Sequence, residues 1–175
     1  MDKFIPVVVI KELDEVDKIL PALKANGINC AEITFRTACA AEAIKLASEK
    51  YPEMNIGAGT VINAKQCNDA ISAGAKFIVS PGLSKGAAKV CKKKNIPYYP
   101  GCVTPTEIIE ALELGITTVK FFPANIYGGL AALKALSAPF PQVKFIPTGG
   151  VDRSNIDEFL AFDKVAAIGS SFFVK

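Results

Sequence analysis

Residues 118–124 read TVKFFPA, a run of β-branched and aromatic side chains with Lys120 near its middle. Gly115 precedes this run, and Pro123 begins the turn-like segment that follows it. The pattern predicts a strand that is covered on both faces in a parallel sheet. Burial disfavours a charged ammonium, and a neutral amine is a nucleophile towards carbonyl groups. Lys120 is therefore either a reactive amine or, alternatively, an ordinary strand lysine that reaches water or pairs with a carboxylate.

Short apolar runs alternate with amphipathic stretches along the rest of the chain, which is typical of βα repetition. The sixth expected strand carries Lys120, and the others lie at residues 5–10, 31–35, 55–61, 77–80, 98–102, 144–147 and 165–168. Helices are expected at residues 13–25, 40–50, 63–74, 84–94, 104–115, 129–136 and 154–162. Three of these helices begin with a residue that can cap them, namely Asn63, Ser84 and Ser154.

This succession of strands and helices predicts an α/β fold, a closed parallel (β/α)8 TIM barrel, built as one domain from residues 1–175. The alternative is a doubly wound open sheet, but no expected strand runs into a G-x-G-x-x-G turn. The sequence ends soon after the eighth expected strand. We therefore expect a barrel that lacks its last covering helix.

Composition excludes several classes of function. The formal net charge is only +3, and the basic run at residues 92–94 closes an expected helix without interleaved aromatic residues, so we expect no nucleic-acid partner. The apolar run at residues 4–10 is too short for a signal peptide or a membrane span. Five cysteines without a C-x-x-C pair favour a reducing compartment, so we expect a cytoplasmic protein.

The chain contains no histidine. This removes histidine-based triads and general bases, and also the commonest zinc ligand of metal-dependent carbon–carbon lyases. The chemistry must then depend on lysine, carboxylates, arginine, cysteine, tyrosine or the backbone, and we expect no metal.

In parallel barrels the chemistry lies at the carboxyl ends of the strands. Glu32 and Thr34 share one face of their strand, which faces the barrel interior if Ile33 packs against helices. Glu32 can then relay protons to a substrate bound at Lys120, although a plain structural ion pair is the alternative. Arg36 follows the same strand, and its planar fork suits a substrate carboxylate.

Two turns of small residues follow the seventh and eighth expected strands. Thr148 leads into Gly149 and Gly150, and the last strand leads into Gly169, Ser170 and Ser171. Barrels often bind phosphate there through backbone N–H groups, so a phosphorylated substrate is expected. The alternative is that these glycines only permit tight turns.

Several segments, in order along nearly the whole chain, resemble the 2-keto-3-deoxy-6-phosphogluconate (KDPG) aldolase family. They are residues 32–37 (EITFRT), 57–61 (GAGTV), 77–82 (FIVSPG), 100–101 (PG), 104–107 (TPTE), 120–124 (KFFPA) and 147–150 (PTGG). The resemblance implies a class I, Schiff-base aldolase on a (β/α)8 barrel, a homotrimer without cofactor, whose partners are a phosphorylated keto-deoxy sugar acid and pyruvate.

The resemblance also implies roles for individual residues. Lys120 forms the imine and Glu32 is the acid–base. The substrate-binding residues are Arg36, Thr60, Pro81 and Thr148, and the phosphate-binding residues are Gly149, Gly150, Gly169, Ser170 and Ser171.

Two positions depart from the family pattern. Asn125 stands where the family commonly has glutamate, and Ser170 stands where it often has glycine, which adds a side chain beside the expected phosphate.

The expected function is therefore cleavage of KDPG to pyruvate and glyceraldehyde 3-phosphate. Sibling aldolases acting on 4-hydroxy-2-oxoglutarate or on an epimeric keto-deoxy-phosphosugar remain alternatives. From another class, a catalytically silent barrel that serves as an oligomeric scaffold remains open as well.

Overall fold

The computed structural model describes residues 2–174 and contains eight strands and seven α-helices in alternation. The strands are β1 Phe4–Val8, β2 Cys30–Thr34, β3 Asn55–Gly59, β4 Ile78–Val79, β5 Tyr98–Tyr99, β6 Thr118–Phe121, β7 Lys144–Pro147 and β8 Ile168–Ser170. The helices are α1 Val16–Ala25, α2 Ala40–Lys50, α3 Ala64–Ser72, α4 Lys85–Lys94, α5 Pro105–Glu113, α6 Gly129–Ser137 and α7 Ile156–Leu160. The 3-10 turns η1 Leu13–Glu15 and η2 Phe172–Val174 complete the elements.

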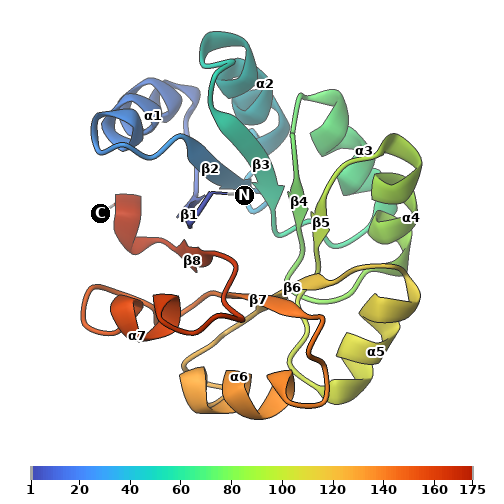
Figure 1. Cartoon of the computed structure of the whole chain (residues 1–175). Helices are drawn as coiled ribbons and strands as arrows, with labels where there is room; N and C mark the ends of the chain where they lie inside the picture. The colour runs from blue at the N-terminus through green and yellow to red at the C-terminus, as the bar shows by residue number, and fades with distance from the viewer. Residues whose placement is uncertain (1, 175) are drawn as a thin grey trace.

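All the strands are parallel and form a curled sheet inside a ring of helices (Figure 1). Six of them pair in the order β5-β4-β3-β2-β1-β8, and β6 pairs with β7. Single bridges join the two groups, between Gly101 and Lys120 and between Thr148 and Gly169. The expected α/β fold of parallel strands is confirmed by this arrangement.

Alternation along each strand sorts the side chains between two layers. One set points outward, as Val8 and Ile33 do, and packs beneath the helices in large apolar clusters. The other set points inward, where one small cluster draws on strands from different sides of the sheet: Ile5, Cys30, Phe77, Val79, Ile146 and Ala167. This inner apolar cluster lies beneath the carboxyl ends of the strands and forms the floor of the site described below.

Three of the seven α-helices begin with a side-chain cap, namely α3, α4 and α5. Asn63 and Ser84 accept hydrogen bonds from the third residue after them, as expected. Thr104 and Glu107 form a capping box, with Pro105 at the first helical position of α5.

The expected cap of the last helix was wrong. The α7 helix begins at Ile156 with Asn155 as its N-cap, because the hydroxyl of Ser154 is already bonded to the Asp152 carboxylate at 2.6 Å.

The expected bounds of the eighth strand were also wrong. The strand lies at Ile168–Ser170, three residues later than expected, because Gly169 and Ser170 pair with Ile5 and Pro6 of β1. Gly169 and Ser170 therefore belong to the sheet rather than to a turn beyond it, and only Ser171 follows the strand as a turn residue.

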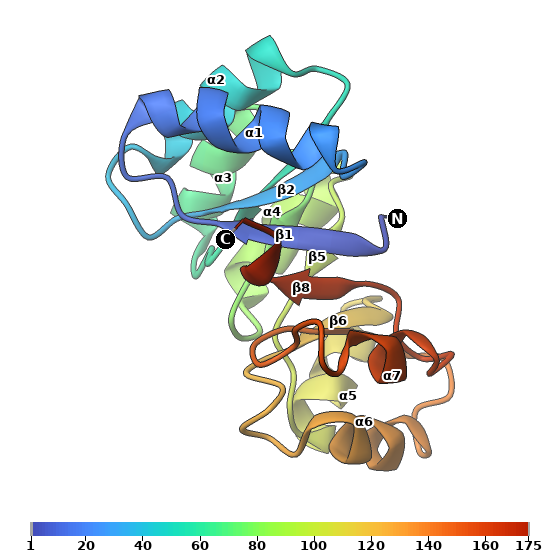
Figure 2. The same ribbon diagram turned by 90° about the vertical axis from the view of Figure 1, so that its left-hand side faces the viewer.

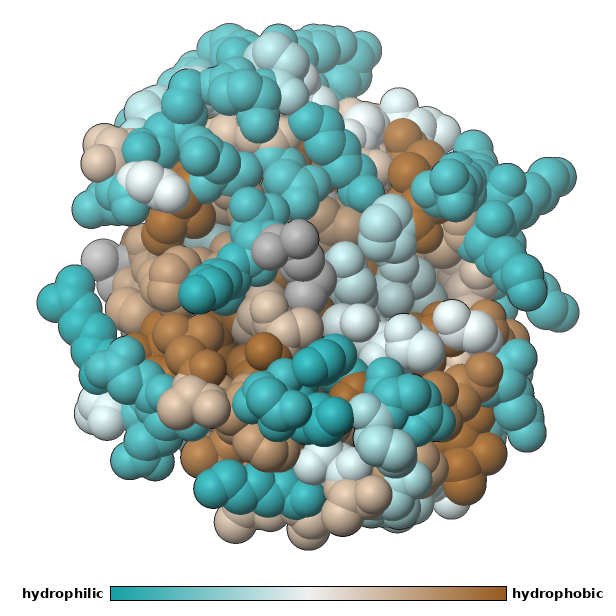
Figure 3. Space-filling model, in the orientation of Figure 1, coloured by the Kyte–Doolittle hydropathy of each residue, from teal (hydrophilic) through white to brown (hydrophobic). Residues whose placement is uncertain are grey.

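The flank of β1 and β8 faces the viewer in Figure 2, between α1 and α7, and η2 packs on it. The ring centroids of Phe173 in η2 and Phe4 in β1 are 5.2 Å apart. Hydrophobic side chains gather over β8 and η2 at the left of Figure 3, and smaller brown patches lie between hydrophilic side chains at the right of the view. Among residues 2–174, no helix is long and apolar enough to cross a membrane.

Candidate active site

Two oppositely charged side chains meet inside the curled sheet. Glu32 on β2 and Lys120 on β6 are only 2% and 4% exposed, and Glu32 Oε1 lies 3.6 Å from Lys120 Nζ. Their strands are not neighbours in the sheet, so the two side chains meet across its interior. The pair expected from the sequence is therefore present, in a setting where each charge depends on the other.

The carboxylate of Glu32 is free to take part in proton transfer. Among the described residues, no donor lies within hydrogen-bond distance of Glu32 Oε1, and the buried hydroxyl of Thr34 also has no partner. A distance of 3.6 Å to Lys120 is longer than a hydrogen bond. An oxygen with an uncommitted lone pair next to an amine is suited to accept and return a proton.

A cavity of about 320 Å³ opens beside Lys120, at the carboxyl ends of the strands. Its lining brings together most of the expected site: Arg36, Lys120, Thr148, Gly149, Gly150, Ser170 and Ser171. It also includes five residues that were not expected, namely Val7, Phe122, Val151, Asp152 and Phe172. The expected Glu32, Thr60, Pro81 and Gly169 are not part of this lining.

Phe122 and Val7 complete the surroundings of the charged pair. The Phe122 ring centroid lies 5.0 Å from Lys120 Nζ, and Val7 is paired with Glu32 in the sheet. Phe122 stands in the same sequence segment as Lys120, which was a usable signal. Val7 carried no signal, because its position depends on the pairing of β1 with β2.

Arg36 lies at the exposed mouth of the cavity and is held by Thr60. Arg36 Nε donates a hydrogen bond of 3.0 Å to Thr60 Oγ1. Thr60 has a φ of +57°, a conformation that is strained for a β-branched residue. The hydrogen bond to Thr60 engages only Nε, which leaves the terminal nitrogens of Arg36 for a carboxylate.

The loop after β7 offers backbone donors. Gly149 and Gly150 have φ values of +87° and +74°, which favour glycine. Their N–H groups have no acceptor among the described residues, whereas the Gly149 carbonyl accepts from Asn125 N. Two free N–H groups at the edge of a cavity are donors that can bind an anion.

The turn after β8 contributes less than the sequence suggested. The Ser170 hydroxyl donates to the Val151 carbonyl at 2.8 Å, so it is directed into the protein. Gly169 packs under Thr148, where an added Cβ would lie 2.3 Å from Thr148 Oγ1. Of these expected phosphate ligands, Ser171 alone is exposed at the cavity.

Asp152 places a negative charge at this end of the cavity. Hydrogen bonds from the Ser154 hydroxyl and N–H lower the pKa of the Asp152 carboxyl, so it is charged at neutral pH. In the sequence, the only sign that Asp152 belongs to the site was its position directly after Gly149-Gly150-Val151.

Two of the cysteines, Cys30 and Cys102, do not compete with Lys120 as nucleophiles. Cys30 lies in the inner cluster, and burial raises the pKa of its thiol. Burial also raises the pKa of Cys102 to about 12. Both thiols remain protonated at neutral pH, and the thiolate is the reactive form.

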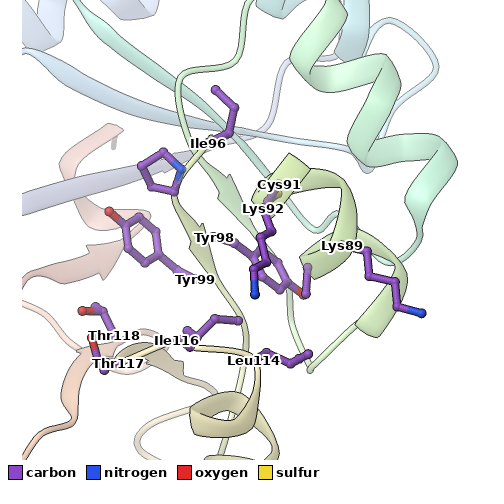
Figure 4. Close-up of a pocket in the computed structure, with 13 residues that line it drawn as sticks. Lys89, Cys91, Lys92, Ile96, Tyr98, Tyr99, Leu114, Ile116, Thr117 and Thr118 are labelled. Atoms are coloured by element: carbon purple, nitrogen blue, oxygen red, sulfur yellow. The ribbon is translucent and has the colours of Figure 1, made fainter. Parts of the chain in front are cut away.

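A larger hollow of about 410 Å³ lies away from the charged pair, between α4 and the segment joining α5 to β6 (Figure 4). Its lining is mostly apolar, with Tyr98, Tyr99, Leu114 and Ile116, and it contains none of the expected site residues. Lys89 and Lys92 also line it, but its lining residues include no carboxylate, so the hollow offers no acid–base pair comparable to Lys120 and Glu32.

Comparison with known proteins agrees with the resemblance seen in the sequence. The family model for KDPG and KHG aldolase matches residues 1–175. A 2-dehydro-3-deoxy-phosphogluconate aldolase from Haemophilus influenzae is 43% identical, over 99% of this chain and 82% of that protein. A KHG/KDPG aldolase from Escherichia coli is 41% identical, over 97% of this chain and 80% of that protein.

Solved structures agree as well. A KDPG aldolase from Legionella pneumophila, with pyruvate captured at low pH as a covalent carbinolamine intermediate, is 44% identical. It superposes with a TM-score of 0.93 over 97% of this chain and 82% of that one. A 4-hydroxy-2-oxoglutarate and KDPG aldolase from TTHB1 is 35% identical, with a TM-score of 0.92 over 99% of this chain and 86% of that one.

Because Lys120 and Glu32 are buried together, we expect the stability of the fold to depend on both charges. Lys120→Met leaves the Glu32 carboxylate buried without a counter-charge, and we expect the free energy of unfolding to fall by about 3–5 kcal/mol. Adding Glu32→Gln removes the second charge and should restore most of that loss. Urea unfolding of both single variants and the double variant measures the coupling.

The exposed pair of Lys18 and Asp14, whose side chains are 68% and 65% exposed, is the matched control. Lys18→Met should cost less than about 1 kcal/mol. Additive effects of Lys120→Met and Glu32→Gln would contradict a charged, coupled pair.

Proposed function

The chain belongs to the KDPG and KHG aldolase family, and from this premise we propose that it is a class I aldolase that cleaves KDPG to pyruvate and glyceraldehyde 3-phosphate. The observation that carries the proposal is the buried Lys120 amine, 3.6 Å from Glu32 Oε1 at the wall of an open cavity. An amine in such a place can attack a ketone that enters the cavity.

In the first step Glu32 takes a proton from the Lys120 ammonium, and the neutral amine attacks the C2 ketone of KDPG. Glu32 returns that proton to the hydroxyl of the carbinolamine, which leaves as water, and the protonated imine that forms is an electron sink next to C3. Because the imine itself accepts the electron pair, the reaction needs no metal and no organic cofactor.

Glu32 then moves the protons. It takes the proton of the C4 hydroxyl, directly or through one water molecule, as the C3–C4 bond breaks and the electron pair passes into the imine. Glyceraldehyde 3-phosphate leaves, and an enamine remains on Lys120. Glu32 returns its proton to C3 of the enamine, and hydrolysis of the pyruvate imine regenerates the amine.

The ends of the substrate are held by different loops. Arg36, oriented by Thr60, binds the C1 carboxylate through its guanidinium, with Thr148 and Pro81 on the pyruvate side. The free N–H groups of Gly149 and Gly150 bind the phosphate.

The turn after β8 completes the phosphate site. Ser171 faces this end of the cavity, and Gly169 and Ser170 hold the turn in place. Asp152 repels an anion placed too near it, which confines the phosphate to the N–H groups.

The same proposal includes the setting of the site. The bridges from Gly101 to Lys120 and from Thr148 to Gly169 support closure of the eight strands into one single-domain (β/α)8 barrel.

Family resemblance supports a homotrimer, and the free cysteines support a cytoplasmic location. Sedimentation at several protein concentrations tests the trimer.

The enzyme reaction is tested by trapping the imine. We expect incubation with pyruvate and borohydride to give a reduced pyruvate adduct on Lys120 alone, located by peptide mapping. Lys120→Arg should remove the adduct, whereas Lys144→Arg, at an exposed amine bonded to the Asp163 carbonyl, should retain it. A folded protein without an adduct, or with an adduct spread over many lysines, would favour a scaffold instead.

Cleavage of 4-hydroxy-2-oxoglutarate (KHG) is a second candidate activity. Two relatives, the Escherichia coli enzyme and the enzyme from TTHB1, have names that include both substrates. KHG has a carboxylate and no phosphate at its far end, so it makes less use of the Gly149 and Gly150 N–H groups.

We expect both substrates to be cleaved, with kcat/KM for KDPG about 10-fold to 100-fold higher, since hydrogen bonds to a charged group stabilise binding strongly. Ser171→Asp should lower kcat/KM for KDPG more than for KHG, because phosphate carries more charge than carboxylate. An equal loss of kcat/KM for both substrates would mean that the phosphate does not bind beside Ser171.

A further inference from the structure

The inner face of β3 carries no side chains at its carboxyl end. Gly57 and Gly59 lie on the face of β3 that is turned into the barrel. Ile56 and Ala58 lie on the other face and pack outward under the helices. Neither glycine has a positive φ, so the backbone alone does not require glycine at these positions. Glycine inside a strand weakens it, which leaves close approach of another group as the reason for it.

At Gly59 that group is the carboxylate of Glu32. A Cβ built on Gly59 would lie 2.0 Å from Glu32 Oε1 and 2.6 Å from both Cδ and Cγ. A Cβ at these distances would overlap the Cγ and Cδ atoms of Glu32 as well as its carboxylate oxygen. Glu32 is 2% exposed, so it has little room to move aside.

The pairing of the strands shows which way Glu32 leans. Glu32 is paired with Gly57, yet its carboxylate lies over Gly59, two residues further towards the carboxyl end. The space over Gly57 is taken by the ring of Phe77, whose atoms would lie 2.3 Å from an added Cβ. Phe77 thus fills the lower position on β3, and Glu32 fills the upper one.

We propose that Gly59 is a positioning residue for the proton-transfer steps: its missing side chain is the space that directs the Glu32 carboxylate towards Lys120. The kinetic consequence of this inference rests on the proposed function, whereas the steric effect depends only on the contact between Gly59 and Glu32. A Cβ at Gly59 would displace the carboxylate from its place 3.6 Å from Lys120 Nζ. The three atoms nearest to the added Cβ all belong to Glu32 and none to Lys120, so we expect the lysine to keep its ability to form an imine.

The test compares Gly59→Ala with Gly86→Ala, a matched change in α4 where an added Cβ would make an ordinary 3.4 Å contact with Ala64. We expect Gly59→Ala to trap pyruvate on Lys120 with borohydride to the same final extent as the parent protein. Exchange of the pyruvate methyl protons in D2O and cleavage of KDPG should each fall by about 100-fold or more, because both require Glu32. Gly86→Ala should match the parent in all three measurements.

A second background separates positioning from simple damage to the fold. In Glu32→Ala the carboxylate is gone, so adding Gly59→Ala should lower proton exchange no further. If Gly59→Ala fails to fold, the double variant should be as stable as Glu32→Ala alone, because the overlapping atoms have been removed. Unchanged exchange in Gly59→Ala, or a double variant that exchanges protons more slowly or is less stable than Glu32→Ala, would overturn the inference.

Failure of the proposed function gives a different result. If the parent protein traps no pyruvate, the thermal unfolding of the same four proteins still tests the contact. Gly59→Ala should then lower the melting temperature in the parent but not in the Glu32→Ala background. Equal destabilisation in both backgrounds would contradict the steric role.

Discussion

The structure depends on one constraint, the burial of a lysine and a glutamate within 3.6 Å of each other in an apolar interior. Removing two charges from water is costly, and their attraction offsets that cost only when the surrounding chain holds them in place. Phe122 faces the amine, Val7 pairs beside the carboxylate, and the inner apolar cluster lies beneath both. In the proposed function both the amine and the carboxylate take part in the reaction.

The curvature of the sheet makes this meeting possible. Residues on β2 and β6 would lie far apart in a flat sheet of the observed strand order, with β3, β4 and β5 between them. Curling brings their inner faces opposite each other. The same curvature gathers the ends of β6, β7 and β8 around one cavity, which is lined by Lys120 and by Gly149 and Gly150. In the proposed function the substrate would lie along this cavity, from Arg36 past Lys120 to the glycine N–H groups.

Much of this was predictable from the sequence, because it depends on local patterns. The alternation of apolar runs and amphipathic stretches gave the number and order of the elements, and the inward parity of Glu32 placed it opposite Lys120. Cap residues with a free side chain, such as Ser84, were also recognisable. These features are set by neighbours in the sequence or by strand parity.

The remainder depended on register and on competing hydrogen bonds, which the sequence does not contain. The β8 strand lay later than expected because its pairing with β1 decides its bounds. Ser154 did not cap α7 because Asp152 had already engaged its hydroxyl, and Ser170 turned away from the cavity to the Val151 carbonyl. The contact between Gly59 and Glu32 was hidden for the same reason, since a glycine in a strand does not reveal which neighbour occupies its space.

The central claim is that Lys120, between Glu32 and the cavity, is the amine that binds the substrate ketone. A crystal structure of the protein soaked with pyruvate tests it most directly. We expect continuous density from Lys120 Nζ to C2 of pyruvate, with the pyruvate carboxylate against the guanidinium of Arg36 and the methyl carbon facing Glu32. Density for pyruvate on another lysine, or an occupied cavity with Lys120 still paired to Glu32 and unmodified, would contradict the account.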